Sequence, residues 1–523
     1  MSDTPKRGAP PKLTGWRRVV PGLRGVRRIY SVFFFGLFVL LLLATDGRYL
    51  KGYESALFLE LDPLTALAGL LTSATLYKGL ALSLLMVIPT LFFGRFFCSW
   101  ICPMGILNQW VGFLFQKRRP SEDHRLNAYR PLFRVKYYLL VALLILAALG
   151  ALQIGLLDPI ALITRSFTLA LFPALQESGV GLYLLTPVFH GGILIAVIFI
   201  GLMVANRLMP RFWCRVLCPL GALLGVMSGR ALFRIRRDVD SCTDCRKCLK
   251  DCQGACDPDG ELRVSECHVC MNCVEACPEG SLHYGLSQAR SSVHKPLDVN
   301  KRRLVESGVA AGLFLPMMKR SLSAESEPSP QVIRPPGSLP EAAFQARCIK
   351  CAACMKVCPT NVLQPALLEG GLEGLWTPIL MNRVGYCEHH CVLCGQVCPT
   401  GAIQPISVAE KVGAEPYKSP VKLGTAFYDR GRCLPWAMQT PCIVCEEVCP
   451  TTPKAIWYRE VERPGRDGFP VALKRPFVDP TLCIGCGVCE NKCPVEDHAA
   501  IRVSSVGESR SSRNQMILKK KQP

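Results

Sequence analysis

Long apolar stretches without charge dominate the first 210 residues and predict helices that cross a membrane. The stretches at 29–45 and 137–157 contain no charged side chain. A helix that spans a bilayer needs about 20 mostly apolar residues, so both are predicted spans. A further span is predicted between Lys78 and Arg95, and another within 178–206. The pattern therefore predicts a membrane domain of about four transmembrane helices.

A shorter apolar stretch at 63–77 is more typical of a segment that lies along the interface or re-enters the membrane than of a span. If it crosses, the number of spans changes by one pair. The first apolar stretch is long and lacks a small-residue cleavage site, so no cleaved signal peptide is expected.

Basic residues flank the apolar stretches and predict the orientation of the chain. Lys and Arg are concentrated at 1–28, 117–134 and 207–237. Loops rich in Lys and Arg remain on the cytoplasmic side, which places these three segments, and the chain that follows the last of them to about residue 300, in the cytoplasm. The excess of 61 Lys and Arg over 40 Asp and Glu, a net charge of +21, is thus explained by a membrane surface, and nucleic acid is not an expected partner.

A sequence pattern occurs twice in the apolar part and predicts an internal repeat. GRFFCSWICPMG, which ends at Gly105, is echoed by PRFWCRVLCPLG, which ends at Gly221. Each copy follows two apolar stretches that are separated by an Asp-Pro, at Asp62 and at Asp158. Two related copies of helix, Asp-Pro loop, helix and Cys-x3-Cys-Pro are therefore expected.

The repeated pattern contains four cysteines that are candidates for a redox or metal role: Cys98, Cys102, Cys214 and Cys218. A spacing of four puts each pair on one side of a helix, so two copies could bring four thiolates together. The alternative is that they are small, buried residues at a helix end.

Beyond residue 237 the cysteines follow the pattern of bacterial two-cluster ferredoxins. In such proteins three closely spaced cysteines hold one 4Fe-4S cluster, and the fourth reaches the other cluster. The first predicted ligand set is Cys242, Cys245, Cys248 and Cys277, and the second is Cys267, Cys270, Cys273 and Cys252. Cys256 is left over and could replace Cys252 as a ligand.

The C-terminal half contains four more cysteine motifs, each ending in Cys-Pro, and predicts four more 4Fe-4S clusters. The motifs are Cys348, Cys351, Cys354 and Cys358, then Cys387, Cys391, Cys394 and Cys398, then Cys433, Cys442, Cys445 and Cys449, then Cys483, Cys486, Cys489 and Cys493. Cys387 and Cys433 lie at unusual spacings and are the less certain ligands. By analogy with related ferredoxins, we expect the outer motifs to pair with each other and the inner motifs likewise.

These cysteines account for most of the 29 in the chain and favour iron over zinc, because structural zinc uses separated Cys pairs or mixes Cys with His. Of the eight histidines only His190 lies in an apolar stretch, so no b-type haem pair is expected. Motifs for covalent haem, phosphate loops and dinucleotides are also missing. We expect an electron carrier without haem, flavin or nucleotide, and not a stand-alone catalyst.

Between the halves, Arg302-Arg303 precedes a short apolar run at 308–318 and a stretch rich in Ser, Glu and Pro. This order is typical of an internal twin-arginine export signal, which would place the C-terminal half in the periplasm. The alternative is an interfacial helix followed by a flexible linker.

The doubled Cys-x3-Cys-Pro and the two-cluster motif of residues 1–290 resemble the NapH/MauN family of membrane ferredoxins. Residues from about 300 onward, with Arg302-Arg303 and four cysteine motifs, resemble the NapG/MauM family of exported polyferredoxins. The chain thus looks like a fusion of the two. This resemblance implies electron flow from the membrane quinol pool through the clusters to a periplasmic cytochrome or reductase, as part of a quinol dehydrogenase in a bacterial inner membrane.

Two other functions remain open. One is an assembly or maturation factor that reduces a metal or disulfide of a partner enzyme, and the other is a relay coupled to a cytoplasmic ferredoxin. The predicted organisation is an α-helical membrane domain, an α+β ferredoxin-like module and a polyferredoxin module. Its parts are a basic tail at 1–28, the membrane domain at 29–230, the two-cluster module at 231–290, the linker at 291–340, the four-cluster module at 341–505 and a basic disordered tail at 506–523.

Overall fold

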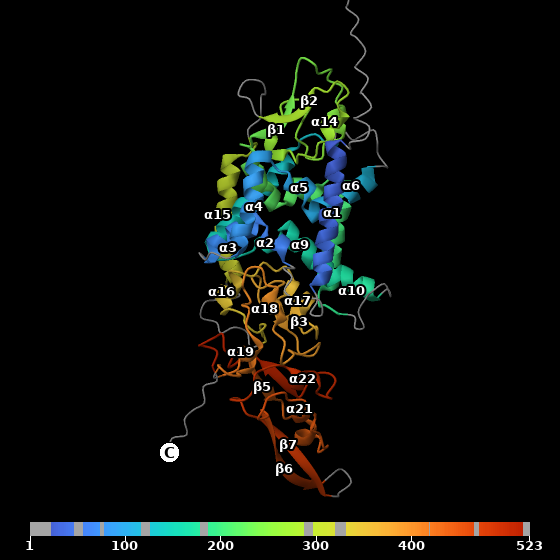
Figure 1. The fold of residues 1–523 in the computed structure, drawn as a ribbon. Coiled ribbons are helices and arrows are strands. Elements are labelled where there is room, and N and C mark those ends of the chain that lie inside the picture. The colour runs from blue at the N-terminus through green and yellow to red at the C-terminus, as the bar shows by residue number, and fades with distance from the viewer. Residues whose placement is uncertain are drawn as a thin grey trace, which may run out of the picture.

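The protein is an elongated molecule with a layer of helices between two cysteine-rich modules (Figure 1). The computed structural model describes residues 22–45, 56–73, 78–116, 126–177, 187–286, 297–319, 331–417, 419–464 and 470–515. The module that contains β1, β2 and α14 lies at one end of the layer, and the module that contains α16 to α22 lies at the other (Figure 1).

The central layer is built almost entirely from short and medium helices. They are α1 (Leu23–Ala44), α2 (Leu57–Glu60), α3 (Pro63–Ser73), α4 (Lys78–Phe93), α5 (Phe97–Trp100), α6 (Pro103–Gln116), η2 (Pro131–Arg134), α8 (Val135–Ala148), η3 (Ile154–Leu156), α9 (Pro159–Ser166), η4 (Phe167–Leu171), α10 (Phe172–Leu175), α11 (Gly192–Val204), η6 (Ala205–Arg207), η7 (Trp213–Leu217) and α12 (Pro219–Ser228). A Pro begins several of them, because the first helical position needs no N–H donor.

Two of these helices are long and apolar enough to cross a membrane, namely Leu23–Ala44 and Pro131–Ala148. The other two predicted spans correspond to α4 and α11, which have 16 and 13 residues. Four complete spans therefore remain a prediction. Large apolar side chains on α1 and α11 are exposed, Ile193 to 83% and Phe33 to 61%, as expected for helices that face lipid.

Helix boundaries differ from the sequence prediction at two points. α1 begins at Leu23 and not at residue 29, so Arg24, Arg27 and Arg28 belong to the helix and not to a preceding tail. α8 ends at Ala148, short of residue 157, because Gly150 adopts a left-handed conformation with φ of 84° and a 3₁₀ turn follows. The predicted short segment at 63–77 contains α3, and residues 74–77 lie outside the described part.

The stretch predicted as a signal or linker forms a long helix, α15 (Lys301–Lys319). It packs along α8 and extends from the level of β1 toward α16 (Figure 1). The contact is close, since a Cβ on Gly308 would lie 2.6 Å from the Ile145 Cδ1 atom. The helix packs lengthwise in the layer and connects the two ends of the molecule, and both interpretations of the segment stay predictions.

The two modules contain only short elements around their cysteine loops. The first has β1 (Phe233–Arg237) paired antiparallel with β2 (Leu282–Leu286), together with α13 (Lys247–Lys250), η8 (Val264–Glu266) and α14 (Asn272–Ala276). The second has the antiparallel pairs β3 (Leu363–Pro365) with β4 (Pro378–Leu380), β5 (Thr425–Tyr428) with β8 (Ile501–Ser504) and β6 (Ile456–Pro464) with β7 (Pro470–Val478). Its helices are α16 (Glu341–Gln345), α17 (Ala353–Val357), α18 (Leu393–Gln396), α19 (Val408–Val412), α20 (Leu434–Ala437), α21 (Val444–Glu447) and α22 (Val488–Asn491).

Residues 506–515 correct the prediction of a disordered tail from residue 506. Glu508 is 1% exposed and Asn514 is 6% exposed. Arg510 forms ion pairs with Glu341 at 2.7 Å and with Glu508 at 2.6 Å. These buried polar contacts hold the segment against the start of the four-cluster module, a feature that its polar composition alone did not reveal. Residues 516–523 lie outside the described part.

Candidate metal centres

In the two-cluster module, the first predicted ligand set lines one small cavity. Cys242, Cys245, Cys248 and Cys277 all border it, although Cys277 is distant from the other three in sequence. Four cysteine thiols around one space are the donor set that a 4Fe-4S cluster requires. The residues present therefore fit the cluster that the spacing predicted.

The second set is also assembled, with both candidates for its fourth ligand in place. The thiol of Cys252 interacts electrostatically with Cys267, Cys270 and Cys273. The Cys256 Sγ lies 3.5 Å from the Cys252 Sγ and also interacts with Cys267. The choice between Cys252 and Cys256 stays a prediction.

The four C-terminal motifs exchange their last cysteines in adjacent pairs. Cys348, Cys351 and Cys354 share a cavity with Cys398, and Cys387, Cys391 and Cys394 share one with Cys358. Cys483, Cys486 and Cys489 share a cavity with Cys449, and Cys433 and Cys445 interact with Cys493. The expected pairing of outer with outer and inner with inner motifs is wrong. Short connections favour pairing between motifs that are neighbours in sequence.

Local backbone geometry explains why four of the six motifs share one spacing. In each C-x2-C-x2-C loop the residues on both sides of the middle cysteine have a positive φ. They are Asp244 and Arg246, Val269 and Met271, Lys350 and Ala352, and Gly485 and Gly487. Alternating right- and left-handed residues turn successive N–H groups toward one concave site. The motifs with Cys387 and Cys433 have longer first loops and do not share this turn.

The bare thiols are mostly neutral, because burial disfavours the charged form. Burial, more than the neighbouring thiols, raises the pKa of Cys351 to about 12. Burial likewise raises the pKa of Cys348 to about 11. Thiolates are the species that bind metal, so loading of these sites must release protons.

Several residues that sequence reasoning missed contact the ligand sulfurs. Lys411, which is 3% exposed, donates to the Cys387 Sγ at 3.2 Å, and Tyr428 lies 3.0 Å from the Cys445 Sγ. The Thr451 hydroxyl lies 3.3 Å from the Cys449 Sγ. Hydrogen bonds to sulfur tune the potential of a cluster. The Thr could have been found from the sequence, since Cys-Pro-Thr occurs three times.

The four candidate sites of the C-terminal module form a series in space. In the C-terminal module Cys354 interacts with Cys394, the Cys387 N–H donates to the Cys486 carbonyl at 2.8 Å, and Cys489 interacts with Cys445. The order from the helical layer is therefore the sites at α17, α18, α22 and α21, which Figure 1 shows one after another.

The four membrane cysteines also meet, as the sequence predicted they could. Cys98, Cys102, Cys214 and Cys218 are each 5–7% exposed, and every pair of these thiols interacts electrostatically. We call them the membrane quartet. In the described part of the chain, no three His, Cys, Asp or Glu side chains are grouped as they would be around a single metal ion.

Two arginines connect the membrane quartet to the two-cluster module. The Nη2 group of Arg95 donates to the Cys98 Sγ at 3.9 Å and lies 3.3 Å from His268 Nε2. Arg211 lies 3.2 Å from His268 Nδ1 and donates to the Cys98 carbonyl at 3.4 Å. His268 follows Cys267 directly, so one imidazole separates a cluster ligand from the quartet. Burial and the adjacent arginines lower the pKa of His268 well below its usual value.

On its other side the membrane quartet leads to the four-cluster module. Asp62 and Asp158 are both 0% exposed, and their side chains contact each other. Asp158 interacts with Cys102 and with Arg165. The Arg165 guanidinium donates to the Lys350 carbonyl at 3.0 Å, next to the candidate ligand Cys351. Buried polar contacts thus extend from one module to the other.

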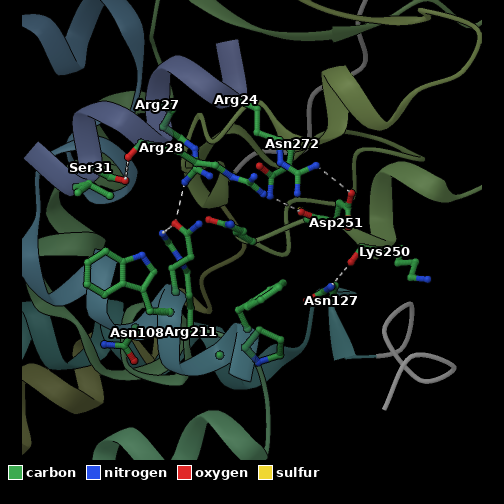
Figure 2. A pocket seen from close by; sticks show the side chains of 18 residues that line it. Arg24, Arg27, Arg28, Ser31, Asn108, Asn127, Arg211, Lys250, Asp251 and Asn272 are labelled. Atoms are coloured by element: carbon green, nitrogen blue, oxygen red, sulfur yellow. Dashed lines mark hydrogen bonds and ion pairs between the residues drawn. The ribbon is translucent and has the colours of Figure 1, made fainter. Parts of the chain in front are cut away.

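A large pocket of about 660 Å³ lies where α1 and α6 meet the two-cluster module. Arg24, Arg27 and Arg28 approach it from α1 and Arg211 from another side (Figure 2). One wall of the pocket is apolar and is formed by Trp110, Phe113 and Val32. The candidate ligand Cys252 is also part of the lining.

The polar side of this pocket includes guanidinium groups with free donors. Arg27 is 0% exposed and donates to Gln109 at 2.8 Å, but its Nε and Nη2 have no hydrogen-bond partner among the described residues. Arg211 also donates to Gln109, at 3.0 Å. Buried donors without partners are unfavourable, so a ligand with acceptor oxygens would be stabilised here.

Comparisons with known proteins find 4Fe-4S binding families in both halves of the chain. A family described as "4Fe-4S binding domain" matches residues 75–122 and 190–239, and a second family with the same description matches residues 344–364 and 476–496. The ferredoxin-type protein MauM of Methylorubrum extorquens is 33% identical over 215 residues, which are 40% of this chain and 90% of MauM. The chain belongs to the ferredoxin-type protein family.

Other relatives of this ferredoxin-type chain are matched over less of their length. The putative electron transport protein YccM of Escherichia coli is 33% identical over 230 residues, or 42% of this chain and 57% of YccM. The ferredoxin-type protein NapG of Haemophilus influenzae is 34% identical over 197 residues, or 38% of this chain and 64% of NapG. The chain therefore spans somewhat more than half of each of these two relatives. No solved structure matches.

Together the cysteine sites and these relatives establish an iron–sulfur electron-transfer protein with 4Fe-4S domains.

Proposed function

We propose that this protein carries electrons from a membrane quinol through its clusters to an acceptor at the far end of the four-cluster module. One observation carries the proposal: two sets of cluster sites lie at opposite ends of a helical layer (Figure 1), and buried groups connect them. When bound, the clusters supply one-electron transfer. The chain fixes the order of the clusters in space and shields them from solvent. Acceptor and membrane side then follow from the family resemblance, with the acceptor a periplasmic cytochrome or reductase.

The quinol head group would bind in the pocket between α1 and α6. Its size lies within the usual range for sites that bind small molecules, and its wall is apolar on the side of Trp110 and Phe113. The free Nε and Nη2 donors of Arg27 can hold a quinol oxygen, and Cys252 in the lining puts the second cluster beside it.

Oxidation of a quinol to a quinone also releases protons, and the pocket offers a group to accept them. Asp251 lines it, is 39% exposed, and lies 3.7 Å from the Arg24 guanidinium. A carboxylate at the edge of a binding site can pass a proton to water. The electrons leave toward Cys252 and the protons toward Asp251, so that the two routes separate.

The orientation rests on two features. The first is the concentration of Lys and Arg near the two-cluster module, which the positive-inside rule places in the cytoplasm. The second is α15, which packs along α8 and extends toward α16. If α1, α4, α8 and α11 cross as predicted, α15 adds a crossing that puts the four-cluster module in the periplasm.

The test is reduction by a menaquinol analogue of the purified, cluster-loaded protein under anaerobic conditions. We expect bleaching of cluster absorbance in the native chain. In Arg27→Gln the KM for quinol should rise about 10- to 100-fold, because a hydrogen bond to a charged donor contributes about 1.5–3 kcal/mol. The matched control is Arg302→Gln, whose side chain is 89% exposed on α15 and should leave KM unchanged.

Two results would count against the proposal in different ways. If quinol reduces no cluster, quinol is not the donor. If bleaching is normal and Arg27→Gln has the native KM, the donor site lies elsewhere and only the assignment of the pocket fails.

A second candidate is an assembly or maturation factor that reduces a metal or disulfide of a partner enzyme. The membrane quartet favours it, because its four thiols are all unpaired. Replacing the four cysteines by Ser should then abolish maturation of the partner and leave reduction of the clusters by quinol intact. A third candidate, a relay to a cytoplasmic ferredoxin, requires the four-cluster module in the cytoplasm, and a reporter fused after Pro340 distinguishes it.

A further inference from the structure

We propose that the membrane quartet holds one additional iron–sulfur cluster, shared between the two Cys-x3-Cys-Pro segments, which links the two modules. Each family match, 75–122 and 190–239, contains only two cysteines. A cluster needs four cysteine ligands, so neither segment can hold one alone. The structure brings both pairs together, with each thiol in electrostatic reach of the other three.

The quartet uses the same local devices as the six recognised sites. Both segments end in Cys-Pro, as the last cysteine of the C-terminal motifs does. The Gly221 N–H donates to the Cys218 Sγ at 3.2 Å, and Gly105 donates in the same way to Cys102. Backbone donors to sulfur also occur at a recognised ligand, where Ile403 donates to the Cys398 Sγ at 3.4 Å. Such bonds stabilise metal-bound thiolates.

The electrostatics around the quartet call for negative charge. Arg95, Arg211 and Lys136 are each 0–1% exposed, whereas Glu266 is the carboxylate that contacts Arg95 and Lys136. Three cations against one carboxylate leave about two positive charges unbalanced, and buried cations are unfavourable without partners. A cluster with four thiolates has a formal charge of about −2.

Nearby carboxyl groups on the opposite side do not remove this excess. Asp62 and Asp158 contact each other, and two carboxyl groups can share a hydrogen bond only when one holds a proton. The remaining charge of this pair faces Arg165. The membrane quartet, together with the adjacent candidate ligand Cys267, which also interacts with Arg95, therefore provides the counter-charge for Arg95, Arg211 and Lys136.

The membrane quartet lies between the two modules, so its cluster would pass electrons from one module to the other. His268 and Arg95 separate the quartet from Cys267, and Asp158 and Arg165 separate it from Cys351. In each transfer one electron leaves the second cluster of the two-cluster module, which is oxidised, and reduces the quartet cluster. The same electron then passes to the site at Cys348, Cys351, Cys354 and Cys398. No bond is made or broken and no further reactant is needed.

The iron content of the protein tests whether the additional cluster exists. Reduction of the two modules by quinol tests its role. Native protein reconstituted with iron and sulfide should contain about 28 iron atoms per chain, against about 24 for six clusters. In the double variant Cys98→Ser, Cys214→Ser, the iron content should fall by about four, and one component should vanish from the Mössbauer spectrum. The matched control is Ser99→Ala, a buried neighbour whose hydroxyl has no partner among the described residues.

Each possible iron content either supports or overturns the additional cluster. A loss of about four or about two iron atoms with the other signals intact supports a 4Fe-4S or a 2Fe-2S cluster. Native protein with about 24 iron atoms, or with zinc or copper at the quartet, overturns the proposal. The relay role, which rests on the proposed function, predicts that quinol still bleaches the two-cluster module of the double variant but no longer the other module. If quinol reduces nothing in native protein while the iron result holds, the proposed function fails and the site stands.

Discussion

The Glu341 carboxylate should contribute strongly to the stability of the four-cluster module. Burial alone would raise its pKa, but Arg334 and Arg510 outweigh burial and hold the pKa at about 2 instead of 4.5. The two contacts are 2.6 and 2.7 Å long, and the Arg334 side chain is 0% exposed. The perturbation is Glu341→Gln, which keeps the shape and removes the charge.

The magnitude follows from the pKa. The difference between 4.5 and about 2 corresponds to about 3 kcal/mol at neutral pH. Breaking a buried pair costs about 3–5 kcal/mol, so we expect a loss of about 3 kcal/mol. Because the folded pKa is lowered, the contribution is complete above about pH 4.5 and is lost as the pH falls toward 2.

The assay is amide hydrogen exchange of the full chain in detergent, followed in α16 and in residues 505–515. At neutral pH, Glu341→Gln should accelerate exchange there about a hundredfold. The matched control is Glu460→Gln, whose ion pair with Lys474 spans 3.8 Å between side chains 75% and 50% exposed. Such a surface pair contributes less than about 1 kcal/mol. An acceleration below about fivefold in Glu341→Gln would show that the Glu341 carboxylate does not stabilise this module.

Three further predictions concern the sites and their contacts. Cys398→Ser should remove the cluster at Cys348 and leave the cluster at Cys391 in Mössbauer spectra of the purified variant. Loss of the cluster at Cys391 instead would contradict the pairing. Gly155→Ala should loosen the contact between the helical layer and the four-cluster module, since its Cβ would lie 1.9 Å from the Ile349 carbonyl oxygen; slower electron passage between modules in stopped-flow spectra is expected, and native rates would contradict it. Lys411→Met should lower the potential of the cluster at Cys387, because a cation stabilises the reduced form; an unchanged or raised midpoint in a redox titration would contradict it.

Cysteine spacing predicted most of the cysteines that the structure groups around common cavities, because the candidate ligands of one cluster are mostly close in sequence. The regular motifs even determine their backbone, as the paired positive φ values at Asp244 and Arg246 show. The exchange of Cys358 and Cys398 was mispredicted, since a remote ligand depends on how motifs pack and not on spacing. The choice between Cys252 and Cys256 stays open for the same reason, because it also depends on how the motifs pack.

Apolar stretches located the helices but not their ends or contacts. Arg24, Arg27 and Arg28 extend α1 beyond its apolar part, where tertiary partners such as Gln109 and Asp251 hold two of the charges. α15 was predicted as a signal or linker because its first turn is strongly charged. Its packing on α8 depends on Gly308 and other long-range contacts that periodicity cannot reveal.

Passage of electrons from a quinol through the helical layer to the four-cluster module can be measured directly. The most direct measurement uses the protein oriented in lipid vesicles, with quinol in the membrane and an impermeant electron acceptor on one side at a time. We expect the acceptor to be reduced when it faces the four-cluster module. Reduction only when the acceptor faces the two-cluster module would contradict it.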